Sequence, residues 1–143
     1  MSIVRQFADA FNQGDVKALV GLFTESGSYD DLFFGLHNGH AALREMFERM
    51  FHEGKGYHWQ FDTVIEDARR AAGEWRFSYT VSDAIPRSAG RPVRFKGMSV
   101  FDLEGGKIAA YREYADSGVA LLQLGFAPEA LAKVLGRKVP RGD

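Results

Sequence analysis

The chain has 143 residues, a length typical of one domain, and its 45% hydrophobic and 26% charged residues are the balance of a folded globular protein. Its 18 Lys and Arg nearly cancel its 19 Asp and Glu, so no strong positive field is available to hold a nucleic acid. The chain has no Cys, which excludes disulfides, thiolate nucleophiles and Cys-ligated metal sites. The N-terminus has no apolar leader and no apolar run is long enough to span a bilayer, so we expect a cytoplasmic protein without a membrane partner.

The first third of the chain has the apolar spacing of helices. Residues 3–11 and 16–23 each place apolar side chains three and four positions apart, and Asp15 stands where the second helix needs an N-cap. The segment 24–39 combines turn residues with clustered aromatics, which predicts a short strand and a loop. A third helix is predicted over residues 40–53.

From residue 58 onward, apolar and polar side chains alternate, as is typical of β-strands. Strands are predicted over residues 58–65, 75–81, 91–103 and 107–114. Helices followed by an antiparallel meander predict an α+β domain whose helices pack on one face of the sheet. We expect a single domain over residues 1–143, with its core at about 3–125 and a C-terminal helix and frayed tail at 126–143.

Several runs of the chain are similar to the nuclear transport factor 2-like superfamily: FNQGDVKALVGLF, then Tyr-Asp-Asp at 29–31, then GHAALREMFERMF. The closing run, GMSVFDLEGGKIAAYREYADSGVALLQLG, most resembles the SnoaL-like polyketide cyclase branch. The resemblance implies a cone-shaped, curved, mainly antiparallel sheet wrapped by N-terminal helices, the cystatin-like α+β barrel. It also implies an internal pocket for a small hydrophobic molecule and a homodimer across the outer sheet face. It implies neither a metal nor an organic cofactor.

Two acidic residues are candidates for proton transfer. Asp31 falls where the resemblance places the general base of a ketosteroid isomerase, and Glu113 lies on a strand whose alternation groups it with Tyr111. If that face lines the pocket, desolvation raises the pKa of Glu113 toward the working pH, as a general acid or base requires. Asp30 and Asp31 point to opposite sides of an extended segment, and either one could enter the pocket. The alternatives are a solvent-facing or Arg-paired Glu113 and an Asx-type turn or helix cap at Asp31.

Two other chemistries of the superfamily fit the sequence less well. A ketosteroid isomerase also needs two oxyanion donors, at positions that read Phe7 and Ser99 here, and phenylalanine donates no hydrogen bond. A limonene epoxide hydrolase-like site needs an arginine and two acids around one water. Arg76 and Glu113 match two of these three groups, whereas Ser78 stands near the position of the other acid. The hydrolase assignment returns if another acid shares a water with Glu113 and Arg76.

The abundant aromatic residues are expected to shape the pocket. With 12 Phe, 5 Tyr and 2 Trp, the chain has more large rings than a small core needs, and Tyr and Trp can also orient a ligand through their polar groups. His58 is a candidate proton shuttle or, alternatively, a half-exposed strand residue. The candidates for substrate binding are Tyr29, Phe34, His58, Trp75, Tyr79, Ser99 and Tyr111.

Together these features predict a cofactor-independent, SnoaL-like enzyme for small molecules. We expect acid/base chemistry on a hydrophobic carbonyl compound, either enolisation or an aldol-type cyclisation or isomerisation, with Asp31 and Glu113 as catalytic residues. The alternative is a non-catalytic module that binds a hydrophobic ligand or dimerises, which the missing oxyanion donors favour. A second alternative is an epoxide hydrolase-like hydrolase.

Overall fold

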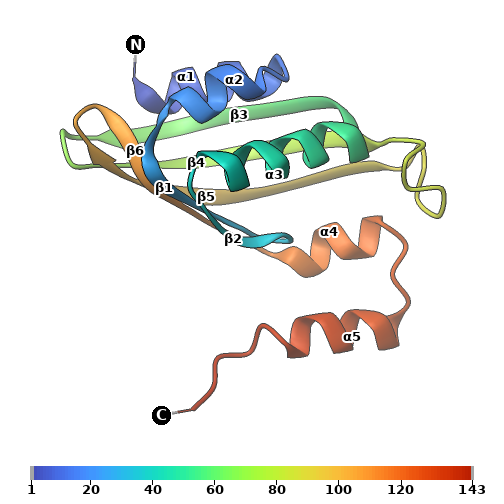
Figure 1. Cartoon of the computed structure of the whole chain (residues 1–143). Coiled ribbons are helices and arrows are strands. Elements are labelled where there is room, and N and C mark those ends of the chain that lie inside the picture. Colours follow the sequence, from blue (N-terminus) through green and yellow to red (C-terminus); the bar gives the residue numbers. More distant parts are fainter. Residues whose placement is uncertain (1, 143) are drawn as a thin grey trace.

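The structure, a computed structural model, describes residues 2–142 as a mixed α+β fold (Figure 1). In chain order the elements are α1 (Ile3–Asn12), α2 (Val16–Gly21), β1 (Phe23–Asp31), β2 (Gly35–Asn38), α3 (His40–Glu53), β3 (Gly54–Glu66), β4 (Arg70–Val81), β5 (Pro92–Glu104), β6 (Lys107–Ala115), α4 (Ser117–Gln123) and α5 (Pro128–Gly136). Within this described part of the chain, no helix has both the length and the apolar character needed to cross a bilayer.

The N-terminal helices begin at the caps that hold their first free amides. The Ser2 hydroxyl accepts a hydrogen bond from the Arg5 N–H at 3.1 Å, and the Asp15 carboxylate accepts one from the Ala18 N–H at 3.0 Å. The prediction that α2 extends to Phe23 is wrong, because α2 ends at Gly21 and Phe23 begins β1. Apolar spacing continues through this junction and therefore does not mark where the helix stops.

The strands form one six-stranded sheet of order β2-β1-β6-β5-β4-β3 within residues 2–142. Neighbouring strands are antiparallel except β1 and β6, which are parallel, so the mainly antiparallel sheet of the predicted fold is confirmed. β1 covers nine residues and is longer than the short strand that the sequence predicts. The reason is local: the pairing register of β1 shifts between Phe23 and Ser28, and this irregularity interrupts the two-residue alternation.

Helix α1 covers the outer edge of the sheet at β3 (Figure 1). The Asn12 side chain accepts a hydrogen bond from the Trp59 N–H at 2.7 Å and donates one to the Trp59 carbonyl at 3.0 Å. The Arg5 guanidinium donates to the Phe61 carbonyl at 2.7 Å. These side chains satisfy backbone groups that an edge strand would otherwise leave unpaired.

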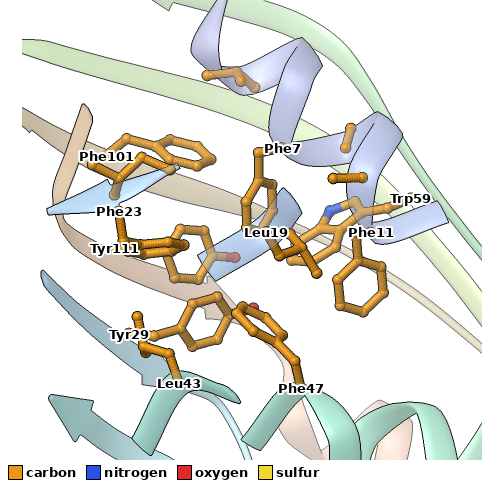
Figure 2. Packing of buried hydrophobic residues seen from close by; sticks show 14 of the residues in the cluster. Phe7, Phe11, Leu19, Phe23, Tyr29, Leu43, Phe47, Trp59, Phe101 and Tyr111 are labelled. Atoms are coloured by element: carbon orange, nitrogen blue, oxygen red, sulfur yellow. The ribbon is translucent and has the colours of Figure 1, made fainter. Parts of the chain in front are cut away.

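Aromatic rings fill the core between the helices and the inner face of the sheet (Figure 2). Phe7 lies at its centre, with its ring centroid 5.1 Å from that of Trp59 and 5.4 Å from those of Phe101 and Tyr111. Rings at these separations pack favourably in tilted or edge-to-face arrangements. Phe7 is fully buried as a packing residue and offers no donor to a ligand.

Candidate active site

The parallel pairing of β1 and β6 brings the two candidate acids together. Tyr29 on β1 is in register with Tyr111 on β6, and the two strands run in the same direction. Side chains two residues further along each strand point to the same face. Asp31 and Glu113 therefore lie next to each other on the inner face, and each affects the pKa of the other.

Asp31 enters the interior, whereas Asp30 is exposed and in register with Arg112 on the opposite face. Asp31 is 8% exposed, and its Oδ2 atom accepts hydrogen bonds from the Phe33 and Phe34 N–H groups, each at 2.8 Å. These bonds form the turn that follows β1, so the Asx-turn interpretation and the inward orientation hold at the same time. Oδ2 of Asp31 anchors this turn, and the other carboxylate oxygen remains for proton transfer.

Glu113 is held by a donor at each of its oxygens. Oε1 accepts a hydrogen bond from the Tyr111 hydroxyl at 2.5 Å, and Oε2 accepts one from the Leu32 N–H at 2.9 Å. Burial, followed by the neighbouring charge of Asp31, raises the pKa of Glu113 to about 8. Burial also raises the pKa of Asp31, against the lowering effect of the two backbone donors and of His37.

The pair therefore holds a proton at neutral pH. Two adjacent buried carboxyl groups do not both ionise, because each charge disfavours the other and neither is well solvated. The two backbone donors on Asp31 lower its pKa, whereas the charge of Asp31 raises the pKa of Glu113, so the proton resides on Glu113. The arrangement supplies a general base and a general acid side by side.

A chain of buried hydrogen bonds continues from Glu113 into the sheet. The Trp75 indole N–H donates to the Ser99 hydroxyl at 2.8 Å, and the Ser99 and Tyr111 hydroxyls are 2.8 Å apart. These three residues are at most 3% exposed. Burial raises the pKa of Tyr111 well above its ordinary value, so its hydroxyl stays protonated and available to Glu113.

A cavity of about 980 Å³ has the acid pair in its wall. Its volume is at the upper end of the range common for small-molecule sites. The lining is dominated by aromatic rings, contributed by Phe11, Tyr29, Phe33, Phe34, Tyr57, Trp59, Trp75, Phe77, Tyr79, Phe95 and Phe126. Apolar residues complete the wall: Leu121 of α4, Leu124 directly after that helix, and Val134 of α5.

Charged groups also line this cavity. The Arg49 guanidinium pairs with the Glu53 carboxylate at 2.9 Å and lies over the Phe34 ring, 4.7 Å from its centroid. The Lys138 ammonium donates to the Leu32 carbonyl at 2.6 Å. The peptide groups of Leu32 thus connect two sides of the site, because its N–H bonds to Glu113 and its carbonyl bonds to the segment after α5.

The predicted substrate-binding residues divide into three groups. Tyr29, Phe34, Trp75 and Tyr79 line the cavity. Ser99 and Tyr111 lie behind its wall, in the buried hydrogen-bond chain. His58 is a correction: it lies on the outer face of the sheet with its Nε2 3.4 Å from Gln60 Oε1.

The arginine of the hydrolase assignment also lies on the outer face. Arg76 donates two hydrogen bonds of 2.9 Å to Asp62, and with Ser78 it borders a shallow surface depression away from the acid pair. Alternation along β4 explains this placement, because the neighbouring Trp75 and Phe77 point inward. Arg76 therefore shares no water with Glu113, and the hydrolase assignment loses the group on which it depended.

Sequence reasoning missed the C-terminal part of the cavity. Lys138 reaches the cavity from the turn after α5. One side of the cavity is lined by this helix, through its N-cap Ala127 and through Ala130 and Val134. Their spacing of three and four residues was the available signal, but small side chains make a weak apolar stripe. Within residues 2–142, no cluster of three His, Asp or Glu side chains suits a metal ion.

A family model described as the SnoaL-like domain matches residues 4–111, which is most of the chain; the match includes Asp31 and ends within β6, two residues before Glu113. The chain belongs to the SnoaL-like domain family. This confirms the resemblance to the SnoaL-like branch of the nuclear transport factor 2-like superfamily. The chain matches no curated protein sequence.

Solved structures share the fold of this SnoaL-like protein at low sequence identity. A protein of ketosteroid isomerase-like fold from Catenulispora acidiphila, solved with trimethylamine, is 19% identical over 89% of this chain and 95% of its own, with a TM-score of 0.77. A protein assigned as a polyketide cyclase from Xanthomonas campestris pv. campestris is 21% identical over 85% and 93%, with a TM-score of 0.71. SalBIII, an epoxide hydrolase/cyclase-like enzyme of pyran ring formation in the polyether salinomycin, is 26% identical over 79% and 87%, with a TM-score of 0.68.

Proposed function

We propose that this SnoaL-like protein is a cofactor-independent enzyme that enolises a hydrophobic carbonyl compound, leading to its isomerisation or aldol-type cyclisation. The observation that carries the proposal is the pair of adjacent buried acids, Asp31 and Glu113, in the wall of an aromatic cavity. A carbon acid is deprotonated efficiently when a base and an acid act on it together. An apolar wall strengthens both groups, because charges and hydrogen bonds act more strongly where water is excluded.

In the proposed reaction, the Asp31 carboxylate removes a proton from the carbon next to the carbonyl. Glu113 donates its proton to the carbonyl oxygen, so the substrate becomes an enol without a free negative charge. A conjugated enol then takes the proton from Asp31 at another carbon, which gives an isomer; alternatively the enol attacks a second carbonyl carbon, which closes a ring, and the new alkoxide oxygen takes the proton from Asp31. The enol oxygen gives its proton back to Glu113 in both routes. In either route a proton returns to Glu113 and Asp31 is again ionised, so the pair ends as it began.

The two acids are suited to these roles by how they are held. The Phe33 and Phe34 amides fix one oxygen of Asp31 and stabilise its ionised form. The pKa of Glu113 at about 8 keeps it protonated near neutral pH yet close enough to that pH to release its proton. The relatives named as cyclases support the ring-closing route, and SalBIII is a neighbour whose reaction is itself a ring formation.

Deuterium exchange tests the proposal directly. A set of hydrophobic ketones such as 2-tetralone and 1-indanone is incubated with the protein in heavy water, and loss of the α C–H signals is followed by proton NMR. We expect exchange above the buffer rate, reduced by about 10²-fold or more in Asp31→Asn and Glu113→Gln. Asp30→Asn is the matched control, since Asp30 is the adjacent exposed acid, and it should exchange like the wild type.

The competing candidate is a non-catalytic module for a hydrophobic ligand, favoured by the aromatic lining and by the absence of a donor at Phe7. Ligand-detected NMR on the same ketones distinguishes the two. Binding without exchange above the buffer rate would favour the binding module. Equal exchange by the wild type and by both acid variants would contradict the catalytic roles.

We also propose that two copies associate through the outer face of the sheet, as the family resemblance implies. Met98 and Tyr114 are direct partners across β5 and β6 on this face, and both side chains are exposed. Association would bury these apolar groups.

A further inference from the structure

The hydrogen bonds behind Glu113 form a line that crosses three strands of the sheet. Trp75 on β4 bonds to Ser99 on β5, Ser99 bonds to Tyr111 on β6, and Tyr111 bonds to Glu113 on the same strand. Ser99 is completely buried, and Tyr111 is 1% exposed. Neither hydroxyl is open to bulk water, so each uses its hydrogen-bonding capacity within the protein.

The donors in this line have one consistent direction. An indole N–H only donates, so the Ser99 oxygen accepts from Trp75. Tyr111 uses its single proton on Glu113 Oε1, so its oxygen accepts from the Ser99 hydroxyl. The sequence Trp75, Ser99, Tyr111, Glu113 therefore runs from a pure donor to a carboxyl group.

The shape of the sheet at Gly97 allows this line to form. Trp75 is directly opposite Gly97 in the β4–β5 pairing, and a Cβ atom at Gly97 would lie 2.8 Å from two atoms of the indole ring. Without that atom, the indole lies across β5 and its N–H reaches Ser99. The small residues Gly97 and Ser99 thus place the large donor of the adjacent strand.

We propose that Ser99 is a positioning residue for the acid pair: oriented by the Trp75 indole, its hydroxyl directs the Tyr111 hydroxyl onto Glu113. Ser99 does not line the cavity and touches no substrate, so it acts through Tyr111. The proposal rests on the proposed function, because it gives Ser99 a purpose in tuning the acid of that reaction. This role differs from that of the oxyanion donor which a ketosteroid isomerase has at the position of Ser99.

The expected consequence is an effect on the acidity of Glu113. The Tyr111 hydrogen bond lowers the pKa of Glu113, while burial and the charge of Asp31 raise it. A donor that itself accepts a hydrogen bond is a stronger donor, so Ser99 reinforces this lowering. Removing Ser99 or Tyr111 should make Glu113 a weaker acid.

Other titratable groups surround Glu113, and substitutions at Ser99 or Tyr111 leave them unchanged. Tyr29 stacks on Tyr111, with ring centroids 4.1 Å apart. The charged or titratable residues that line the cavity around the pair are His37, Arg49, Glu53, Arg87 and Lys138, together with Tyr57 and Tyr79. Because none of them is altered, a change in titration reports on the hydrogen-bond line.

The test is a carbon-13 NMR titration of the Glu113 carboxyl group in protein labelled at glutamate, with Glu113→Gln used to assign the signal. We expect Tyr111→Phe to raise the pKa of Glu113 by about 1 or more, since hydrogen bonds to charged groups are the strong ones. Ser99→Ala should raise it by less, and Ser99→Thr, which keeps the hydroxyl, should restore it. Ser117→Ala is the matched control, a buried serine on α4 outside the line, and should leave the titration unchanged.

If folded Ser99→Ala leaves the pKa of Glu113 unchanged, the proposal is overturned. A lower melting temperature without a change in this pKa would show that Ser99 has only a structural role. If Ser99→Ala does not fold, Trp75→Phe removes the first donor and should raise the pKa of Glu113 in the same direction; no shift there overturns the proposal equally. The titration needs no substrate. Shifted titrations without ketone exchange would therefore contradict the enzyme function only, and exchange with unshifted titrations would contradict the positioning role only.

Discussion

The two faces of β5 and β6 carry acidic residues in opposite environments. On the outer face, Asp102 bonds to Arg70 and Arg112, each at 2.8 Å, and the Arg112 hydrogen bond in particular lowers the pKa of Asp102. On the inner face, Glu113 has Asp31 beside it in a buried wall, and its pKa rises to about 8. The two acids lie on adjacent strands and differ in the face to which they point. Orientation within the sheet, more than residue type, decides which acid can act near neutral pH.

The largest expected effect is on stability against pH. Between the ordinary pKa of 4.5 and about 8, folded Glu113 keeps a proton that the unfolded chain releases, so stability falls as the pH rises through this window. At about 1.4 kcal/mol for each pKa unit, the loss is up to about 5 kcal/mol. Glu113→Gln should flatten the dependence and be more stable than the wild type at about pH 8.

Urea unfolding across this pH window measures the free energy of unfolding of the wild type and of Glu113→Gln. Asp62 and Asp102 give the opposite sign, because their lowered pKa values stabilise the fold above the acid range, and this contribution is lost as the pH falls. A wild type as stable at about pH 8 as at about pH 5 would show that Glu113 is not held protonated.

A smaller effect on stability is expected at Gly97, which lies on β5 opposite Trp75. An alanine Cβ there would lie 2.5 Å from the Tyr114 carbonyl oxygen and 2.8 Å from the Trp75 ring, so the backbone or the indole must shift. We expect Gly97→Ala to cost roughly 1–3 kcal/mol in thermal unfolding. The matched control is Gly136→Ala in α5, where no atom lies within 4 Å of the added carbon. It should be neutral or stabilise by up to about 1 kcal/mol.

The smallest effect is expected on the outer face. Asp102→Asn removes both ion pairs with Arg70 and Arg112, but these side chains are about one-third or more exposed. Exposed ion pairs contribute little, so the free energy of unfolding should change by about 1 kcal/mol or less, and ketone exchange should not change. A loss as large as that of the acid-pair variants would contradict the division between the two faces.

The helices and most strands could be predicted from the sequence because each depends on local spacing. Residues 3–11 and 40–53 show the apolar stripe of a helix, and the structure has α1 and α3 there with boundaries within a residue. The extent of β1 could not be predicted, because its register shift between Phe23 and Ser28 breaks the alternation. A Cβ at Gly27 would lie 2.9 Å from the Thr24 carbonyl, a backbone approach that no local pattern reveals.

The site could be predicted in parts. Tyr29 with Asp31, and Tyr111 with Glu113, share a face by alternation, so each half is readable from the sequence. The parallel pairing that joins the halves is a contact between residues 81 positions apart, as in the bond from Leu32 to Glu113, and no local signal encodes it. The prediction that His58 lines the pocket contradicts the alternation of its own strand, since its neighbour Trp59 points inward.

Leu32 connects the acid pair to the C-terminal part of the structure. Its amide hydrogen reaches Glu113 at 2.9 Å, and its carbonyl oxygen is held by the Lys138 ammonium at 2.6 Å. The two peptide groups share the Leu32 α-carbon, so both hydrogen bonds restrain the position of the same residue. A displacement of the segment after α5 would therefore act on Glu113 through one residue, Leu32, which lies 106 positions before Lys138 in the chain.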